Sequence, residues 1–131
     1  MTRLPRLLLA VALGGSLLIG PAAAANHYTY SASKFGEAQA TGKPILVDIS
    51  ASWCPVCKAQ NSVIERELAK PEFARYVVFS VDFDSQKDVV RAFNAPMQST
   101  LIVFKGKNEK TRLVGVTDPN IIDAMMRRAA D

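Results

Sequence analysis

The chain has 131 residues, of which 49% are hydrophobic and 21% charged; this is the composition of one globular domain and excludes a disordered chain. Its formal net charge is +4 at pH 7, yet the basic residues form no run that would suggest a nucleic-acid groove. We therefore expect a single compact core and no nucleic-acid partner.

The first 25 residues have the pattern of a secretory signal peptide. Two arginines give a basic start, an apolar stretch runs from Leu7 to Ile19, and Ala23 to Ala25 supply an A-x-A cleavage site. The apolar stretch is shorter than the roughly 20 residues that span a bilayer as a helix. We expect residues 1–25 to be cleaved and residues 26–131 to form the exported domain; the alternative is an uncleaved N-terminal anchor.

The mature part begins with a predicted strand, helix and strand. Tyr28–Tyr30 fits a short edge strand, and Ser33 is a plausible N-cap for a helix that ends near Ala40. Ile45–Ile49 is apolar apart from one acid, which predicts a strand buried on both faces.

A second helix is expected from near Cys54 to about Ala69. Its predicted apolar stripe consists of Val56, Val63, Ile64 and Leu68. Tyr76–Phe83 has the pattern of a second buried strand, and Gln86–Phe93 that of a helix.

The last third of the chain predicts two strands and a closing helix. The strands are Thr100–Phe104 and Arg112–Val116, joined by a hairpin turn at 105–108. Asp118 and Pro119 suit the cap and first position of the closing helix. Its predicted inward side chains are Ile121, Ile122, Met125 and Met126. Crossover units followed by an antiparallel hairpin indicate an α/β fold with a mixed central sheet of four to five strands and helices on both faces.

The sharpest chemical signal is the pair Cys54 and Cys57, which lies where a buried strand turns into a helix. At a helix N-terminus, free N–H groups and the positive end of the dipole stabilise a thiolate, so we expect the pKa of the Cys54 thiol to lie below that of a free thiol. Pro55 has no N–H, which leaves the amides of Val56 and Cys57 as donors to the Cys54 sulfur. Cys54, nearer the turn and the exposed end, would attack a substrate disulfide, and Cys57 would resolve the mixed disulfide.

Two other interpretations of the pair remain open. Exported proteins use static disulfides, but this one would close almost no loop and so would stabilise little. A copper- or zinc-binding module would hold its metal through Cys54 and Cys57, although the single histidine, His27, lies far upstream.

The segment Ile45–Lys58, which ends in Trp53-Cys54-Pro55-Val56-Cys57-Lys58, resembles the active-site segment of the thioredoxin family. Gly42-Lys43-Pro44 before it is similar to thioredoxin-like domains of exported reductases, and Thr100–Gly106 extends the likeness over essentially all of the mature part. The resemblance implies a thioredoxin-like fold. It also implies a thiol–disulfide oxidoreductase that works through the redox-active disulfide Cys54–Cys57, without a cofactor or a bound metal.

The resemblance assigns roles to residues around the pair. Trp53 corresponds to the aromatic residue that flanks and shields the active site; the alternative is a side chain that fills the core. Asp48 corresponds to the family's buried acid, and an acid inside an apolar strand should be neutral or have a raised pKa, which suits a proton acceptor for Cys57. The alternative for Asp48 is an exposed strand end with bonds to turn amides. Residues expected to tune the site or to contact substrate are Trp53, Pro55, Val56, Lys58, Ser99 and Thr100.

Two positions depart from the family's pattern. Ser99 stands where a cis-proline normally faces the cysteines, and a cis bond before a non-proline residue costs about 2.5–4 kcal/mol, which favours a trans bond and a differently shaped loop from Pro96 to Ser99. In the family this loop docks substrate backbone, so substrate choice should differ. Ser80 stands where thioredoxins often carry a lysine near the buried acid, so we expect proton handling around Asp48 to differ as well.

The leader and the pair together suggest a monomeric periplasmic reductase. It would take electrons from a membrane thiol donor and pass them to disulfides of other exported proteins. Pro55-Val56 lacks the histidine of strongly oxidising relatives, which favours reduction over the alternatives, oxidation or isomerisation.

Overall fold

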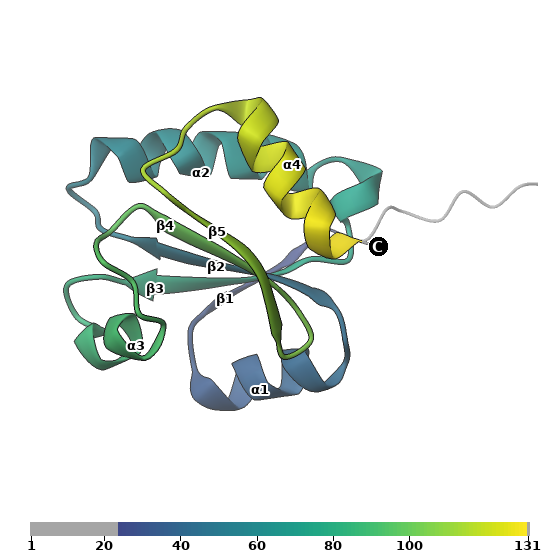
Figure 1. Ribbon diagram of the computed structural model, residues 1–131, viewed down its shortest axis with the longest axis horizontal. Coiled ribbons are helices and arrows are strands. Elements are labelled where there is room, and N and C mark those ends of the chain that lie inside the picture. The colour runs from purple at the N-terminus through teal and green to yellow at the C-terminus, as the bar shows by residue number, and fades with distance from the viewer. Residues whose placement is uncertain (1–23, 131) are drawn as a thin grey trace, which may run out of the picture.

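Five strands form one mixed sheet in the order β1-β3-β2-β4-β5 in the computed structural model, which describes residues 24–130 (Figure 1). The strands are β1 Asn26–Thr29, β2 Pro44–Ser50, β3 Val77–Asp82, β4 Thr100–Lys105 and β5 Asn108–Val114. The helices are α1 Ala32–Ala40, α2 Pro55–Leu68, α3 Lys87–Ala92 and α4 Pro119–Ala130, with a 3-10 turn at Pro71–Phe73. Strands β1, β3 and β2 run parallel, whereas β4 is antiparallel to both β2 and β5. The predicted α/β fold is confirmed.

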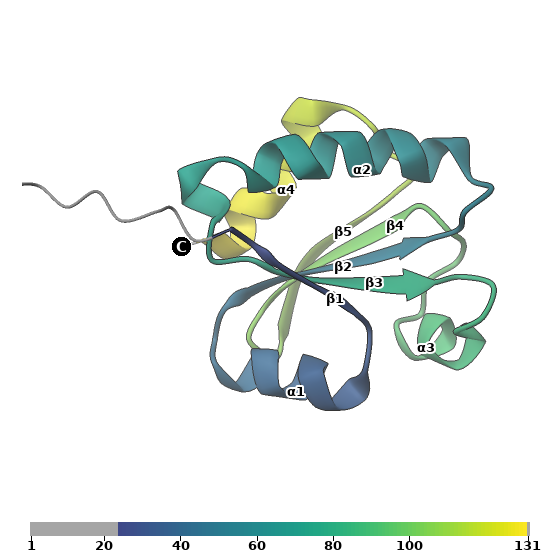
Figure 2. The ribbon, with the colours of Figure 1, turned by 180° about the vertical axis from the view of Figure 1, so that it is seen from behind.

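Helices cover both faces of this sheet. Figures 1 and 2 show α2 and α4 on one face and α1 and α3 on the other. Leu46 of β2 packs in the core beneath α2 and α4, whereas its neighbours Ile45 and Val47 pack in the core on the side of α1 and α3. Successive strand residues point to opposite faces, so Asp48 points towards the α2 side. Strand β2 is therefore buried on both faces, as its apolar run predicts.

The start of α1 differs from the prediction. Ser31, not Ser33, is the N-cap: it has extended backbone, and the Lys34 amide donates to its Oγ at 3.3 Å. Ser33 lies inside the helix, where its hydroxyl donates to Glu37. Both serines fit a capping pattern, and the helix begins at the earlier one.

Three other predictions about facing and extent are wrong. Val56 and Ile121 are 39% and 47% exposed, so neither belongs to an apolar stripe. The buried face of α2 starts one position later, at Cys57, and of the adjacent Ile121 and Ile122 only the second turns to the sheet. Strand β5 begins at Asn108 rather than Arg112, because its first half is exposed and polar and carries no apolar signal.

The prediction of a signal peptide at residues 1–25 lies almost wholly outside the described residues and stays a prediction. Among residues 24–130, no helix has the length and apolar character needed to cross a membrane.

Candidate active site

The disulfide Cys54–Cys57 lies at the start of α2, and the short turn of residues 51–53 separates it from the end of β2. The Cα atoms of the two residues are 5.3 Å apart. Cys54 is the N-cap of α2, and the Cys57 amide donates to its Sγ at 3.1 Å. This is the usual N-cap hydrogen bond, in which the side chain of the N-cap accepts from the amide of the third helical residue. The Val56 amide, also predicted as a donor, makes no such bond among the described contacts.

Cys54 is less exposed than predicted. Its exposed fraction is 4% and that of Cys57 is 2%, because both residues pack with Ala51 and Phe83. Cys54 nevertheless lines a shallow surface hollow of about 190 Å³, together with Ser52, Trp53, Pro55 and Lys58, and Cys57 does not line it. The hollow supports the prediction that Cys54 is the sulfur that a substrate reaches.

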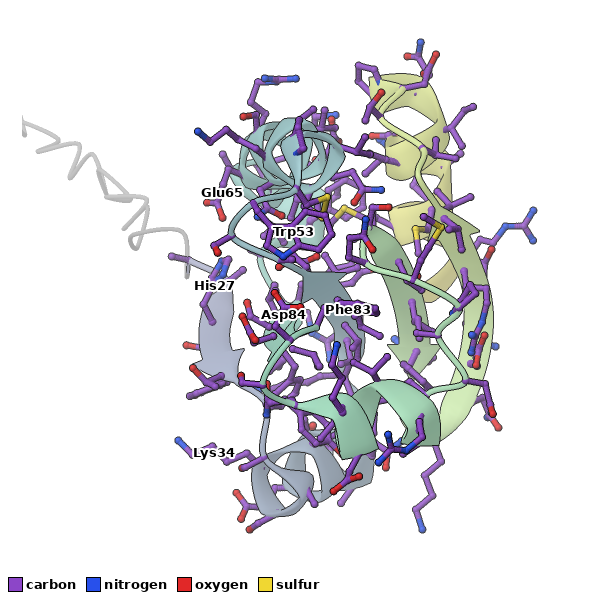
Figure 3. The ribbon with its side chains drawn as sticks, turned by 90° about the vertical axis from the view of Figure 1, so that its left-hand side faces the viewer. His27, Lys34, Trp53, Glu65, Phe83 and Asp84 are labelled. Carbon is purple, nitrogen blue, oxygen red and sulfur yellow. A yellow bond between two sulfur atoms is a disulfide. The ribbon has the colours of Figure 1, made fainter. Side chains whose placement is uncertain are left out.

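Trp53 lies at the surface beside the disulfide. It is 59% exposed, which excludes the alternative of core filling. Its indole nitrogen donates to Asp84 Oδ2 at 2.7 Å, and Figure 3 shows this nitrogen directed towards Asp84. The Nζ of Lys87 lies 3.7 Å from Asp84 Oδ1 and 4.1 Å from the centre of the Phe83 ring, so the acid is itself held in place. Sequence reasoning missed Asp84, because a carboxylate in a turn 31 residues away carries no signal for this contact.

Asp84→Ala should loosen the indole without unfolding the chain. Trp53 is the single tryptophan, so its fluorescence reports on the site alone. We expect lower fluorescence anisotropy and a loss of roughly fivefold in the exchange rate, since one hydrogen bond contributes about 1 kcal/mol. The control is Asp88→Ala, which removes an exposed acid on α3. Unchanged anisotropy in Asp84→Ala would show that the bond does not hold the ring.

Asp48 is buried beneath α2. It is 5% exposed and lies between Ser80 of β3 and Leu101 of β4 in the sheet register. This burial contradicts the alternative of an exposed strand end. Desolvation raises the pKa of Asp48 to about 6, although a hydrogen bond from the Ser50 side chain acts in the opposite direction. Its Oδ1 has no hydrogen-bond partner in the described part of the chain.

An uncharged side chain lies next to this acid. Ser80 lies opposite Asp48 on β3 and is exposed. Because serine carries no charge, this position holds no cation that compensates a charge on the carboxylate. Lys58 is also exposed, on the outer side of α2. A carboxyl group with a pKa of about 6 changes its protonation just below neutral pH, and the role of Asp48 as proton acceptor for Cys57 stays a prediction.

The loop before β4 has the altered shape that Ser99 suggested. The structure has no cis peptide bond among the described residues, and Ser99 adopts a left-handed backbone with φ of 62°. Ser99 is 3% exposed, while Met97 in the same loop is 43% exposed. Thr100 is fully buried, and its hydroxyl donates to the Met97 carbonyl at 2.7 Å. Thr100 thus shapes the loop from below rather than contacting substrate.

The site offers few ligands for a metal. Within residues 24–130, no three side chains of histidine, cysteine, aspartate or glutamate lie together in a way that could hold an ion. His27 is in β1, at the outer edge of the sheet and two strands away from β2 (Figure 3). The two sulfurs are bonded to each other, which suits a redox pair.

Comparisons with known proteins agree with this geometry. The family model described as Thioredoxin matches residues 26–128. A thioredoxin H-type from Fagopyrum esculentum is 33% identical over 68% of this chain and 75% of its own length, and thioredoxin-2 from Saccharomyces cerevisiae is 33% identical over 72% and 90%.

Solved structures give the same result. The crystal structure of Trxlp from Edwardsiella tarda matches with a TM-score of 0.75 and 39% identity, over 77% of this chain and 98% of that one. The thioredoxin-like fold is thereby confirmed. Because the matched residues include the whole sheet and the Cys54–Cys57 pair, the chain belongs to the thioredoxin family, whose members are thiol–disulfide oxidoreductases that need no cofactor beyond their cysteines.

Proposed function

We propose that the protein is an exported reductase that delivers electrons through Cys54 and Cys57 to disulfides of other exported proteins. The observation that carries the reducing direction is the environment of the Cys54 sulfur. Its one hydrogen bond among the described contacts comes from the Cys57 amide. Pro55 has no N–H that could donate to this sulfur, and the residues Val56 and Lys58 are exposed to solvent.

The direction follows from how strongly a site stabilises its thiolate. A strongly stabilised thiolate makes the reduced form stable and the protein oxidising, as in the most oxidising relatives. A thiolate with one amide donor and the helix dipole is stabilised only moderately. The disulfide form is then comparatively stable, and the reduced form passes its electrons on.

The exchange proceeds in two displacements. The Cys54 thiolate attacks one sulfur of a substrate disulfide, forms a mixed disulfide and releases the other substrate sulfur as a thiolate. Cys57 then loses its proton to Asp48, and its sulfur attacks the Cys54 sulfur. The second substrate sulfur leaves as a thiolate, so the substrate gains two electrons and the protein is left with the Cys54–Cys57 disulfide.

The protein must then be reduced again. A dithiol donor regenerates the two thiols by the same displacements in reverse. In an oxidising exported compartment no soluble thiol pool serves this purpose, which supports a thiol donor in the membrane. The support for export is the N-terminal pattern of residues 1–25.

The reduction potential distinguishes reductase from oxidant. The protein is equilibrated with thiol buffers, and Trp53 fluorescence reports the oxidised fraction. The reduction potential of the Cys54–Cys57 pair should lie near the roughly −270 mV of reducing relatives rather than the roughly −120 mV of oxidising ones. A value near about −120 mV would contradict reduction and favour oxidation, and a value near about −180 mV would favour isomerisation.

Val56→His tests the explanation of the potential. The position is 39% exposed and lies between the cysteines, so a histidine should fit and add a positive donor near the thiolate. We expect the potential to rise by about 30 mV or more, which corresponds to about 1.4 kcal/mol. Ile121→His, at an exposed position on α4, is the matched control and should not change the potential. Equal potentials of the Val56→His variant and the unmodified protein would contradict the explanation.

Export has its own test. The protein isolated from the periplasmic fraction of its host should begin at Asn26, as read by N-terminal sequencing. A chain that is found in the cytoplasm and begins at Met1 would contradict export while leaving the exchange chemistry untouched.

A further inference from the structure

Gln60 is a fully buried polar side chain on α2, one helical turn after Cys57. Its Nε2 donates to the Ser99 carbonyl at 3.2 Å and to the Val116 carbonyl at 2.9 Å. The Gly115 amide donates to the same Ser99 carbonyl at 2.9 Å. One amide group therefore joins the active-site helix to two connections, the loop before β4 and the segment after β5.

The position is a costly place for an amide. A buried polar group destabilises the fold unless it is hydrogen-bonded, and Gln60 Oε1 has no partner in the described part of the chain. An apolar side chain would fill this part of the core without that cost. What the glutamine adds is its pair of donor bonds, and both end on backbone carbonyls of connecting segments.

One of those segments is under strain. Ser99 has φ of 62°, a left-handed conformation that is unfavourable for residues other than glycine. Such a conformation persists where its surroundings hold it. Within the loop, the hydroxyls of Ser99 and Thr100 donate to the carbonyls of Gln98 and Met97. The Gln60 and Gly115 bonds to the Ser99 carbonyl add contacts from outside the loop.

The same loop lies beside the disulfide. Thr100, which follows Ser99, pairs with Ile49 of β2, and β2 leads directly into the turn that carries Cys54. The loop and the disulfide therefore lie at the same end of the strands β2 and β4. Met97 of the loop is 43% exposed, so a protein that brings a disulfide to the nearly covered Cys54 must also cover this loop.

We propose that Gln60 is a positioning residue that holds the Ser99 loop against α2 and thereby sets the affinity for protein disulfides. The glutamine touches neither substrate nor the reacting sulfurs; it acts through the backbone of Ser99 and Val116. This role rests on the thiol–disulfide exchange activity of the family and does not depend on whether the protein reduces or oxidises its partners.

Gln60→Met is the test, because methionine matches the length of the side chain and lacks its donors. With insulin as protein disulfide, we expect KM to rise about tenfold and kcat to change less than twofold. A small disulfide such as hydroxyethyl disulfide requires the Cys54 sulfur and little of the loop. The ratio of the insulin rate to this rate should therefore fall about tenfold.

Hydrogen exchange adds a readout that does not depend on activity. The Gly115 amide, which bonds to Ser99, should exchange about tenfold faster in Gln60→Met than in the unmodified protein. Val63→Ala is the matched control, since it removes buried volume from the same helix without a bond to the loop. It should lower the stability but leave KM and the Gly115 exchange rate, relative to that of the core, unchanged.

Three results would overturn the inference: equal increases in KM for Gln60→Met and Val63→Ala, parallel losses with insulin and with the small disulfide, or an unchanged Gly115 exchange rate. Failure of the proposed reductase function would look different. It would appear in the unmodified protein as an oxidising potential, and the comparison between the two variants would still hold.

Discussion

Cys54→Ser is expected to reduce the rate of insulin reduction to that of the thiol buffer alone, because the variant lacks the nucleophile that opens the substrate disulfide. Cys57→Ser should also stop turnover, but at a later stage. Its Cys54 still attacks, and the mixed disulfide then persists because no second thiol displaces the substrate. The two variants are distinguished by non-reducing electrophoresis and mass spectrometry, which should show the covalent adduct with Cys57→Ser only.

Folding of these variants is checked independently. The disulfide joins residues only three apart, so its loss should change the stability little. Circular dichroism of both variants should therefore match that of the reduced protein. Full activity of Cys54→Ser would contradict the assignment, and an adduct formed through Cys57 would reverse the two roles.

Asp48→Asn should stabilise the protein at neutral pH and slow its chemistry. Burial raises the pKa of Asp48 from 3.8 to about 6, so the folded state binds its proton more tightly than the unfolded state does. The contribution of Asp48 to the free energy of unfolding is then greatest below about pH 4, falls as the pH rises to about 6, and is constant above that. The fall amounts to about 3 kcal/mol for this shift.

Urea unfolding of the oxidised protein at several pH values measures this effect. The free energy of unfolding of Asp48→Asn minus that of the unmodified protein isolates this fall, and it should grow with pH to up to about 3 kcal/mol at pH 7.5. Asp88→Asn, an exposed position on α3, should keep the fall. The same pH dependence in Asp48→Asn would show that another group is responsible.

The kinetic effect of Asp48→Asn concerns the second displacement. Without a carboxylate to accept the Cys57 proton, resolution of the mixed disulfide should slow by about a hundredfold, the lower end of the range for general base catalysis. In the unmodified protein the rate of this step should rise with pH around a midpoint near 6, the pKa of Asp48. Stopped-flow measurement of Trp53 fluorescence follows it directly, and a step of equal rate in both proteins would exclude Asp48 as the base.

Much of the fold was predictable because its signals are local. The apolar run Ile45–Ile49 predicts a central strand and the paired cysteines mark the start of α2. The exposed parts were harder. The first half of β5 has no apolar period to reveal it, and the choice between Ser31 and Ser33 as cap depends on where the chain leaves β1.

In the candidate site, too, some residues could be predicted from the sequence and others could not. The cysteines and the buried Asp48 are visible in the sequence because each residue type is unusual in its place. Asp84 and Gln60 were not found, since both act through contacts between segments far apart in the chain. The substitution at Ser99 was visible and predicted a trans bond, but the left-handed backbone that replaces the family's geometry became apparent only in the folded structure.

Trapping of partners in the native host tests the central claim most directly. The Cys57→Ser variant, produced with its leader, should accumulate as mixed disulfides whose bonds, identified by mass spectrometry, run from Cys54 to cysteines of exported proteins and of a membrane thiol donor. Adducts with cytoplasmic proteins alone, or no adduct at all under conditions in which the variant is folded, would contradict the account of an exported reductase.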